Sequence, residues 1–227
     1  MIALIDSPPG SPTPLPLPDR AWAGRALARR LASLGPDTLV LALPRGGVPV
    51  AAEIARMLGA KLELLLVRKI GVAWQPELAY AALVDGNPPE LVLNAELAAE
   101  LPADRAWLEA AVAEQRAELE RRRARYLGGR PAPSVAGRKV VVVDDGLATG
   151  TTMRAALQAL RRQGPARLVL AVPVAPASTL AALAPLADAV CCLASPEPFH
   201  AIGFHYADFH QLDDEEVDAA LRRAGRP

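Results

Sequence analysis

The stretch VVVVDDGLATGTTM, Val140 to Met153, decides the fold of this chain. Four consecutive valines are typical of a strand buried on both faces of a parallel sheet. Two adjacent carboxylates, Asp144 and Asp145, follow the strand, and a short turn leads straight into an amphipathic helix. In an open α/β sheet, ligands bind at the carboxyl ends of the strands. This joint between strand and helix is therefore predicted to be a binding site.

The turn after the carboxylates combines two glycines with three hydroxyls: Gly146, Gly150, Thr149, Thr151 and Thr152. Backbone N–H groups of a glycine-bearing turn can approach an anion closely, and the following helix N-terminus adds a partial positive charge. The turn therefore predicts a phosphate site with two acids on its rim, which suits a sugar phosphate. The alternative is an ordinary joint that binds nothing. The turn has neither the Gly-Lys-Ser/Thr of a P-loop nor the G-x-G-x-x-G of a dinucleotide site.

These residues resemble the signature of type I phosphoribosyltransferases. That signature is a hydrophobic strand, two acids, a short turn, then Thr-Gly and two small or hydroxylated residues, as in Val140–Thr152. The resemblance implies that Asp144 and Asp145 hold the ribose hydroxyls of 5-phosphoribosyl-1-pyrophosphate (PRPP). It also implies that the 5-phosphate is bound by the turn residues Ala148, Thr149, Gly150, Thr151 and Thr152.

A second strand–glycine turn–helix joint lies at Pro44-Arg45-Gly46-Gly47. Taken alone, a Gly-Gly turn is merely tight. In the family, however, the first strand often ends in Arg-Gly-Gly or Lys-Gly-Gly, which binds pyrophosphate, and the chain is closest to uncharacterised members with Arg-Gly-Gly. The resemblance therefore assigns Arg45, Gly46 and Gly47 to pyrophosphate. Family members often have a cis non-proline peptide in this loop, which the sequence leaves open.

The whole chain is predicted to be an α/β protein with a mainly parallel, five-stranded sheet, because strands alternate with helices. The resemblance implies the type I phosphoribosyltransferase (Rossmann-like) fold. Six prolines between Pro8 and Pro18 make residues 1–18 a disordered or extended lead-in. Residues 19–227 form one domain, with an insertion at about 72–127 and a hood at about 195–212. The expected strands are 38–43, 61–67, 139–143, 167–174 and 189–193.

Arg68 and Lys69 follow the expected strand 61–67, so both are placed at the same sheet edge as Arg45. One interpretation is ordinary solvated charge. The other is that Arg68 and Lys69 neutralise the pyrophosphate as it leaves. The family has a mobile lid after its second strand, and Val72–Glu77 is the candidate for it here.

The segment from Pro102 to Tyr126 has helical spacing and is rich in arginine. Glu114, Glu118 and Glu120 alternate with the arginines, which favours a solvated helix face or a dimer surface. Some type I enzymes complete the pyrophosphate site from a dimer partner, so a homodimer is expected. The alternative is a protein that senses PRPP or a nucleotide. RNA binding is expected only in that case.

The tail contains all three histidines and all three phenylalanines. In the family a hood at the strand ends recognises the base, and aromatic faces stack on flat heterocycles. The predicted hood residues are Phe199, Phe204, Tyr206 and Phe209, with a satellite core as the alternative. His200, His205 and His210 are spaced five apart, which is a weak pattern for a metal site.

Composition limits the kinds of partner and the location expected for the protein. The chain has 25 basic and 25 acidic residues and a sequence pI near 6.8, so no pull toward DNA or an anionic membrane is expected. Cys191 and Cys192 are neighbours that should point to opposite faces of a strand, as in a reduced protein. With neither a signal peptide nor a run of eighteen apolar residues, the protein is expected in the cytoplasm and off the membrane.

The resemblance implies displacement at the anomeric carbon of PRPP, with pyrophosphate leaving and a nitrogen of a nucleobase or related acceptor attacking. Asp144, Asp145, Arg45 and Lys69 are the expected catalytic residues. Mg²⁺ is the expected cofactor, held mainly by PRPP oxygens, with Asp144 and Asp145 as further ligands. Ala148 stands where hypoxanthine/guanine enzymes usually have an acid, which argues against that class and leaves the acceptor and the general base open. An aspartyl phosphatase with Asp144 as nucleophile ranks last, because adjacent carboxylates point apart.

Overall fold

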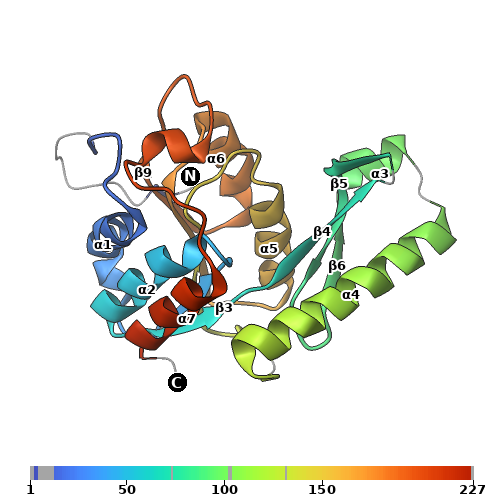
Figure 1. The fold of residues 1–227 in the computed structure, drawn as a ribbon, viewed down its shortest axis with the longest axis horizontal. Helices are drawn as coiled ribbons and strands as arrows, with labels where there is room; N and C mark the ends of the chain where they lie inside the picture. The colour runs from blue at the N-terminus through green and yellow to red at the C-terminus, as the bar shows by residue number, and fades with distance from the viewer. Residues whose placement is uncertain (1–2, 5–12, 73, 102–103, 131, 226–227) are drawn as a thin grey trace.

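The computed structural model describes residues 3–4, 13–72, 74–101, 104–130 and 132–225. A body built on a parallel sheet carries an arm, residues 67–127, that projects from one side (Figure 1). In the body, helices cover both faces of the sheet. In the arm, a long helix lies along a small antiparallel sheet.

Within the described residues the body sheet has six parallel strands, whereas the sequence predicts five. Each of the five predicted strands is found, but the one predicted at 61–67 ends at Leu64. The sixth, β1, is Ala3–Leu4 of the expected lead-in, which pairs with the start of the strand at 189–194. An edge strand needs only one backbone partner, and the prolines begin after it. The order is β1 (Ala3–Leu4), β9 (Ala189–Ala194), β8 (Arg167–Val174), β7 (Lys139–Val143), β2 (Leu39–Ala42) and β3 (Lys61–Leu64).

The valine strand β7 is buried on both faces, as its sequence predicts. Val140 to Val143 all have 0 % exposure. Val141 and Val143 join one core with helices α1 (Arg20–Arg30), α2 (Gly47–Leu58) and α7 (Asp214–Arg223). Val140 and Val142 join a second core with α5 (Thr151–Arg162) and α6 (Ala177–Leu183). Full burial explains why the strand has no polar residue until Asp144.

Polar side chains cap the N-termini of several of these helices. Asp19 Oδ1 accepts from the N–H of Trp22 at 2.6 Å, as the sequence predicts for α1. Asp213 and Glu216 form a capping box at the start of α7. Single 3₁₀ turns, Ala32–Leu34, Ala184–Leu186 and Ile202–His205, finish α1 and α6 and begin the hood.

The cysteines of β9 point to opposite faces, as alternation on a strand predicts. Cys191 belongs to the core beside α1 and α2, whereas Cys192 packs against the core beside α5 and α6. Both are free thiols. Burial raises the pKa of Cys191 to about 12 and the pKa of Cys192 to about 11, so neither is a reactive thiolate at neutral pH.

The arm is a three-stranded antiparallel sheet of β4 (Val67–Val72), β5 (Gln75–Val84) and β6 (Glu90–Leu93). It is followed by α3 (Ala95–Glu100) and α4 (Arg105–Leu127). The predicted hairpin is confirmed as β5–β6, but the arm has one more strand. Helix α4 starts after an Asp104 cap, and the Pro102 predicted to begin it lies outside the described residues. Among the described residues, no helix is both long and apolar enough to cross a membrane.

The positions predicted for Arg68 and Lys69 are wrong. Strand β3 ends at Leu64, and both cations lie within β4, in the separate sheet of the arm. There Arg68 pairs with Leu83 and Lys69 with Ala82 of β5. Residues 67–72 form a strand because they pair with β5, and this pairing cannot be read from the local sequence. The expected lid, residues 72–77, spans the end of β4 and the start of β5, with residue 73 outside the described residues.

Candidate functional site

The two glycine joints lie side by side because their strands are neighbours. Ala42, at the end of β2, pairs with Val143, at the end of β7, and the N–H of Leu43 donates to the Val143 carbonyl at 2.9 Å. The Arg45–Gly47 loop and the Asp144–Asp145 pair therefore leave the sheet together. The sequence places both joints at the same edge of the sheet, and the strand order makes them neighbours.

Both loop glycines are required by close contact with the acids. A Cβ on Gly46 would lie 2.1 Å from Oδ2 of Asp145, and a Cβ on Gly47 would lie 2.6 Å from the carbonyl oxygen of Val143. Gly46 has φ −56° and ψ −40°, which any residue can adopt. At Gly46 the limit is therefore space, and its backbone is pressed onto the carboxylate.

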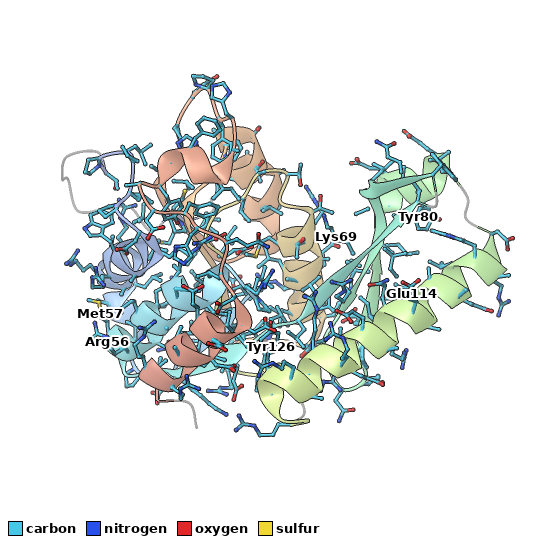
Figure 2. The ribbon with its side chains drawn as sticks, viewed as in Figure 1. Arg56, Met57, Lys69, Tyr80, Glu114 and Tyr126 are labelled. Atoms are coloured by element: carbon cyan, nitrogen blue, oxygen red, sulfur yellow. The ribbon has the colours of Figure 1, made fainter. Side chains whose placement is uncertain are left out.

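The peptide between Pro44 and Arg45 is cis, which answers the question left open by the sequence. The Arg45 side chain is 41 % exposed, with Nη1 3.9 Å from Oδ1 of Asp214 on α7. The hydroxyl of Tyr126, at the C-terminal end of α4, donates to the same carboxylate (Figure 2). Burial and Asp214 raise the pKa of Tyr126 to about 12. Arg45 thus stands where the loop, α7 and α4 meet.

The two acids have different surroundings. Asp144 is half-buried, and its Oδ1 accepts from the N–H of Asp145 at 2.9 Å. Burial, together with the neighbouring charge of Asp145, raises the pKa of Asp144 well above its usual value. Asp145 is 8 % exposed, and its Oδ2 accepts from Nε of Arg20 at 2.8 Å. Burial raises the pKa of Asp145 too, but Arg20 opposes that rise.

Arg20 is the site residue that sequence reasoning missed. It lies in the first turn of α1 and is 8 % exposed. Its guanidinium carbon lies 3.9 Å from the ring centroid of Phe209, and Nη1 donates to the carbonyl oxygen of His210 at 3.0 Å. The only local signal was a cation at a helix N-terminus, the end that the macrodipole makes unfavourable for positive charge.

Two of the four predicted hood aromatics contact Asp145 or its partner Arg20. The hydroxyl of Tyr206 donates to the carbonyl oxygen of Asp145 at 2.6 Å, and its ring stacks on Phe209 at 5.0 Å. Tyr206 is 5 % exposed, and burial raises the pKa of its hydroxyl well above the usual value. Phe199 is half-buried against the core, with its ring 4.8 Å from that of His205. Of the four, only Phe204, at 74 % exposure, presents its ring to solvent.

The hood packs directly on the turn. A Cβ on Gly146 would lie 2.6 Å from Ile202. On the other side of the turn, the hydroxyl of Thr179 donates to the carbonyl oxygen of Ala148 at 2.7 Å. Gly150 has φ +71°, and a Cβ there would lie 2.8 Å from Thr179, so conformation and space both require glycine.

Helix α5 starts from this turn at Thr151. The first N–H groups of a helix have no intrahelical acceptor, so they point out of the N-terminus. The hydroxyls of Thr149 and Thr151 lie 3.2 Å apart beside them. The turn thus presents backbone and side-chain donors to one point, where an anion fits.

The two arm cations lie on opposite faces of β4. Nε of Arg68 donates to Oε1 of Gln115 on α4 at 3.0 Å, and burial and Arg122 lower the pKa of Arg68. Neighbours on a strand alternate, so Lys69 lies on the other face, toward α5 (Figure 2). A cavity of about 210 Å³ separates the arm from α5, with Thr151 and Arg154 in its wall.

The histidines of the tail lie in three different surroundings. Burial lowers the pKa of His205, and the ring of His200 lies 5.9 Å from that of Phe204. His210 lies 2.8 Å from Asp208 and 2.7 Å from Glu216, and these carboxylates raise the pKa of His210. Among the described residues there is no group of three His, Cys, Asp or Glu side chains that could hold a metal ion.

Residues 19–191 match the family model of the phosphoribosyl transferase domain. The chain belongs to this family. The match spans both glycine joints, the acids and Arg20. It ends before the hood, so the family model says nothing of Phe204 or Tyr206.

Relatives and a solved structure agree. A Mycobacterium tuberculosis H37Rv protein named "Putative phosphoribosyl transferase" is 48 % identical over 209 residues, which cover 92 % of this chain and 47 % of that protein. A protein of the same name from strain CDC 1551 matches equally. The chain thus spans about half the length of the curated relatives it matches. The crystal structure of TT1426 from Thermus thermophilus is 45 % identical, with a TM-score of 0.78, over 90 % of this chain and 97 % of that one.

Proposed function

We propose that the protein is a PRPP-dependent phosphoribosyltransferase that transfers the 5-phosphoribosyl group to a nitrogen of a nucleobase or related acceptor and releases pyrophosphate. One observation carries this proposal. The backbone of Gly46 lies against the carboxylate of Asp145, beside an anion-binding turn at the start of α5. A pyrophosphate loop, a pair of ribose carboxylates and a phosphate turn are the three parts that PRPP needs.

In this proposal the 5-phosphate lies in the turn at residues 148–152, where donors converge. The ribose hydroxyls lie on the acids. Asp144 makes the more direct contact, because Oδ2 of Asp145 is already bound by Arg20. The pyrophosphate extends over Arg45–Gly47. The loop is short and tightly packed, so it positions the leaving group.

The acids also fit Mg²⁺ as an ion held mainly by the oxygens of PRPP. Carboxylate oxygens are the ligands that Mg²⁺ prefers. Arg20 pairs with Asp145, whereas burial and the neighbouring charge of Asp145 raise the pKa of Asp144. A cation there would favour the ionised form of Asp144. Bound Mg²⁺ would neutralise charge on the leaving pyrophosphate.

The chain's own residues supply electrostatics and orientation. The bond from the anomeric carbon to pyrophosphate breaks with the electron pair leaving on oxygen, and the acceptor nitrogen forms the new bond. Arg45 meets the negative charge that grows on the leaving group. Lys69 lies in the separate arm sheet, on the face toward α5, and its role at the pyrophosphate stays a prediction. Arg68 is bound to α4, and its assignment to pyrophosphate has no contact that supports it.

We further propose a cytoplasmic homodimer whose acceptor is recognised under the hood. Phe204 supports this assignment, because it is the exposed aromatic ring of the hood. The alternative of an RNA-binding sensor relied on the arginines of α4. Arg121 and Arg122 pair with Glu118 at 2.7 and 2.8 Å, and Arg123 pairs with Asp85. These partners leave the transferase as the better-supported function.

The test is calorimetric titration with Mg-PRPP, followed by pyrophosphate release against a panel of purines, pyrimidines and other nitrogen heterocycles. Wild type should bind, and one acceptor should release pyrophosphate. Asp144→Asn should bind PRPP far more weakly, whereas Asp188→Asn, which changes a surface acid just before β9, should bind as wild type does. No binding at millimolar PRPP would exclude the proposal. Binding without turnover on any acceptor would favour the sensor.

A further inference from the structure

A shallow groove runs along α4 where the helix lies beside Leu91 of β6. It has a volume of about 460 Å³ and combines apolar residues with three charges. Figure 1 shows α4 packed on the arm sheet by one side, with its other side at the edge of the molecule. The part of its lining that α4 supplies includes Glu109, Val112, Ala113, Arg116 and Glu120.

Residues of the arm hairpin and of the body both hold α4 near its C-terminal end. Arg123 pairs with Asp85, whose side chain is fully buried, and also donates to the carbonyl oxygen of Gly86 at 3.2 Å. Nη1 of Arg125 lies 3.0 Å from Oδ2 of Asp218 on α7. These contacts hold one end of the 23-residue helix, and its N-terminal part runs along the arm sheet (Figure 1).

We infer that this face binds the same face of a second copy, with the two α4 helices antiparallel about a two-fold axis between Val112 and Ala113. A two-fold contact must be self-complementary. Glu109 and Arg116 are equidistant from that axis, so each lies opposite the other across the interface. Arg105 and Glu120 are also equidistant from it. Four intermolecular ion pairs follow, two of each kind.

The helix puts these charges on one line. At 100° per residue, Arg105, Glu109, Arg116 and Glu120 lie within about 30° of a single line along α4, with Val112 and Ala113 flanking it at the centre. Arg105 is 91 % exposed and Glu109 is 66 % exposed. Arg105 and Glu109 already pair within the helix at 2.8 Å, so each partner would extend an existing pair. Small central side chains allow helix axes to approach to about 8–10 Å.

Charge also selects the register. A parallel pair would place Glu109 on Glu109 and Arg116 on Arg116. An antiparallel pair shifted by about a turn would place either Glu109 on Glu120 or Arg105 on Arg116. Each of these arrangements opposes like charges, which disfavours it. Balanced net charge adds no long-range repulsion between two copies.

This inference rests on the homodimer in the proposed function and not on PRPP chemistry. The two can fail separately, because assembly and PRPP binding are measured independently. A monomer that binds Mg-PRPP would overturn only the interface.

Sedimentation equilibrium on the full chain tests the register. Glu109→Arg and Arg116→Glu each place like charges opposite one another, so each should raise the dimer dissociation constant by about tenfold or more. The double variant restores opposite charges and should return to within about threefold of wild type. Circular dichroism checks that α4 stays helical. A wild-type monomer, or a double variant weaker than both singles, overturns the interface.

Cross-linking tests the axis without altering charge. Two copies of Ala113→Cys would have Cα atoms within about 7 Å, which a disulfide can bridge. Two copies of Ala124→Cys, exposed on the same helix, would lie about 35 Å apart along it. Mild oxidation should give a covalent dimer for the first variant and none for the second. Equal cross-linking of both, or of neither, contradicts the proposed axis.

Discussion

Arg20 and Asp145 form a buried ion pair, with 2.8 Å between Nε and Oδ2, although 125 residues separate them in the sequence. Arg20 is itself held by the ring of Phe209 and the carbonyl of His210. Helix α1, the acids after β7 and the tail are thereby joined at one point. The geometry of the proposed ribose site thus depends on residues from both ends of the described domain.

Replacing Arg20 with Met should destabilise the fold by about 3–5 kcal/mol, because it leaves the carboxylate of Asp145 buried without a partner. Arg20 opposes the rise in the pKa of Asp145, so this pKa should rise further in the variant. A group whose folded pKa is raised loses its contribution to stability as pH rises through that pKa. As pH rises above the ordinary carboxyl pKa, the variant should therefore lose stability more steeply than wild type, as urea unfolding would show.

Two controls separate the pair from general loss of charge. Arg20→Lys keeps the cation and should recover part of the stability and of the affinity for Mg-PRPP. Arg25→Met removes an arginine from the same helix whose Nη1 lies 3.9 Å from Glu53 and whose side chain is 39 % exposed. It should cost less than about 1 kcal/mol. Equal losses for Arg20→Met and Arg25→Met would contradict the role of the pair.

Asp144→Asn should stabilise the ligand-free protein at neutral pH while weakening Mg-PRPP binding. Burial and Asp145 raise the pKa of Asp144, so its contribution to stability is full below about pH 4 and declines as pH rises through the folded pKa. Asparagine removes that decline. The measurement is the melting temperature from pH 4 to 8, compared with a PRPP titration at pH 7.5.

Asp188→Asn is the matched control, and its effect on stability at neutral pH should be opposite to that of Asp144→Asn. Its carboxylate accepts from Arg161 and from the N–H of Leu168, and these bonds lower the pKa of Asp188. Its contribution is therefore present above the ordinary carboxyl pKa and is lost as pH falls through the lowered folded value. The variant should be less stable than wild type at pH 7. If both asparagine variants shift stability in the same direction, the assignment for Asp144 is wrong.

Gly46→Ala should disturb the site through contact alone. Its Cβ would lie 2.1 Å from Oδ2 of Asp145, although the backbone conformation suits alanine. We expect a loss of about 1–3 kcal/mol and a clear loss of Mg-PRPP affinity. Gly129→Ala is the control, because φ is +75° there and nothing lies within 4 Å. It should cost about 1–2 kcal/mol of local strain without changing PRPP affinity. Unchanged PRPP binding in Gly46→Ala would rule out tight packing of the loop on the acid.

Tyr206→Phe and Phe204→Ala should separate support from recognition within the hood. The hydroxyl of Tyr206 is the donor to the buried carbonyl of Asp145, so its loss should cost about 1–3 kcal/mol. Phe204 is 74 % exposed, so its truncation should change stability by less than about 0.5 kcal/mol. If Phe204 contacts the acceptor, its truncation should raise KM for the acceptor without changing PRPP affinity. The reverse pattern in melting and kinetics would exchange the two roles.

Local pattern was sufficient for the elements whose structure depends on local residues. The valines of β7, the glycine turn before α5 and the Asp19 cap are each specified by neighbours in the sequence, and each is found where expected. Strand β4 was missed because its partner β5 decides whether Val67–Val72 is a turn or a strand. The lead-in strand Ala3–Leu4 was missed for the same reason, since its partner lies in β9.

The sequence by itself determined that parallel strands end in an anion turn, two acids and a glycine loop, because strand burial, helix capping and glycine's small size act over a few residues. Tertiary structure alone decided which acid is bound and which remains available. Asp144 and Asp145 are chemically identical, and only folding brings Arg20 to one of them. It also placed Tyr206 against the carbonyl of Asp145 and Phe209 against Arg20, because these contacts depend on how the tail packs on the rest of the chain.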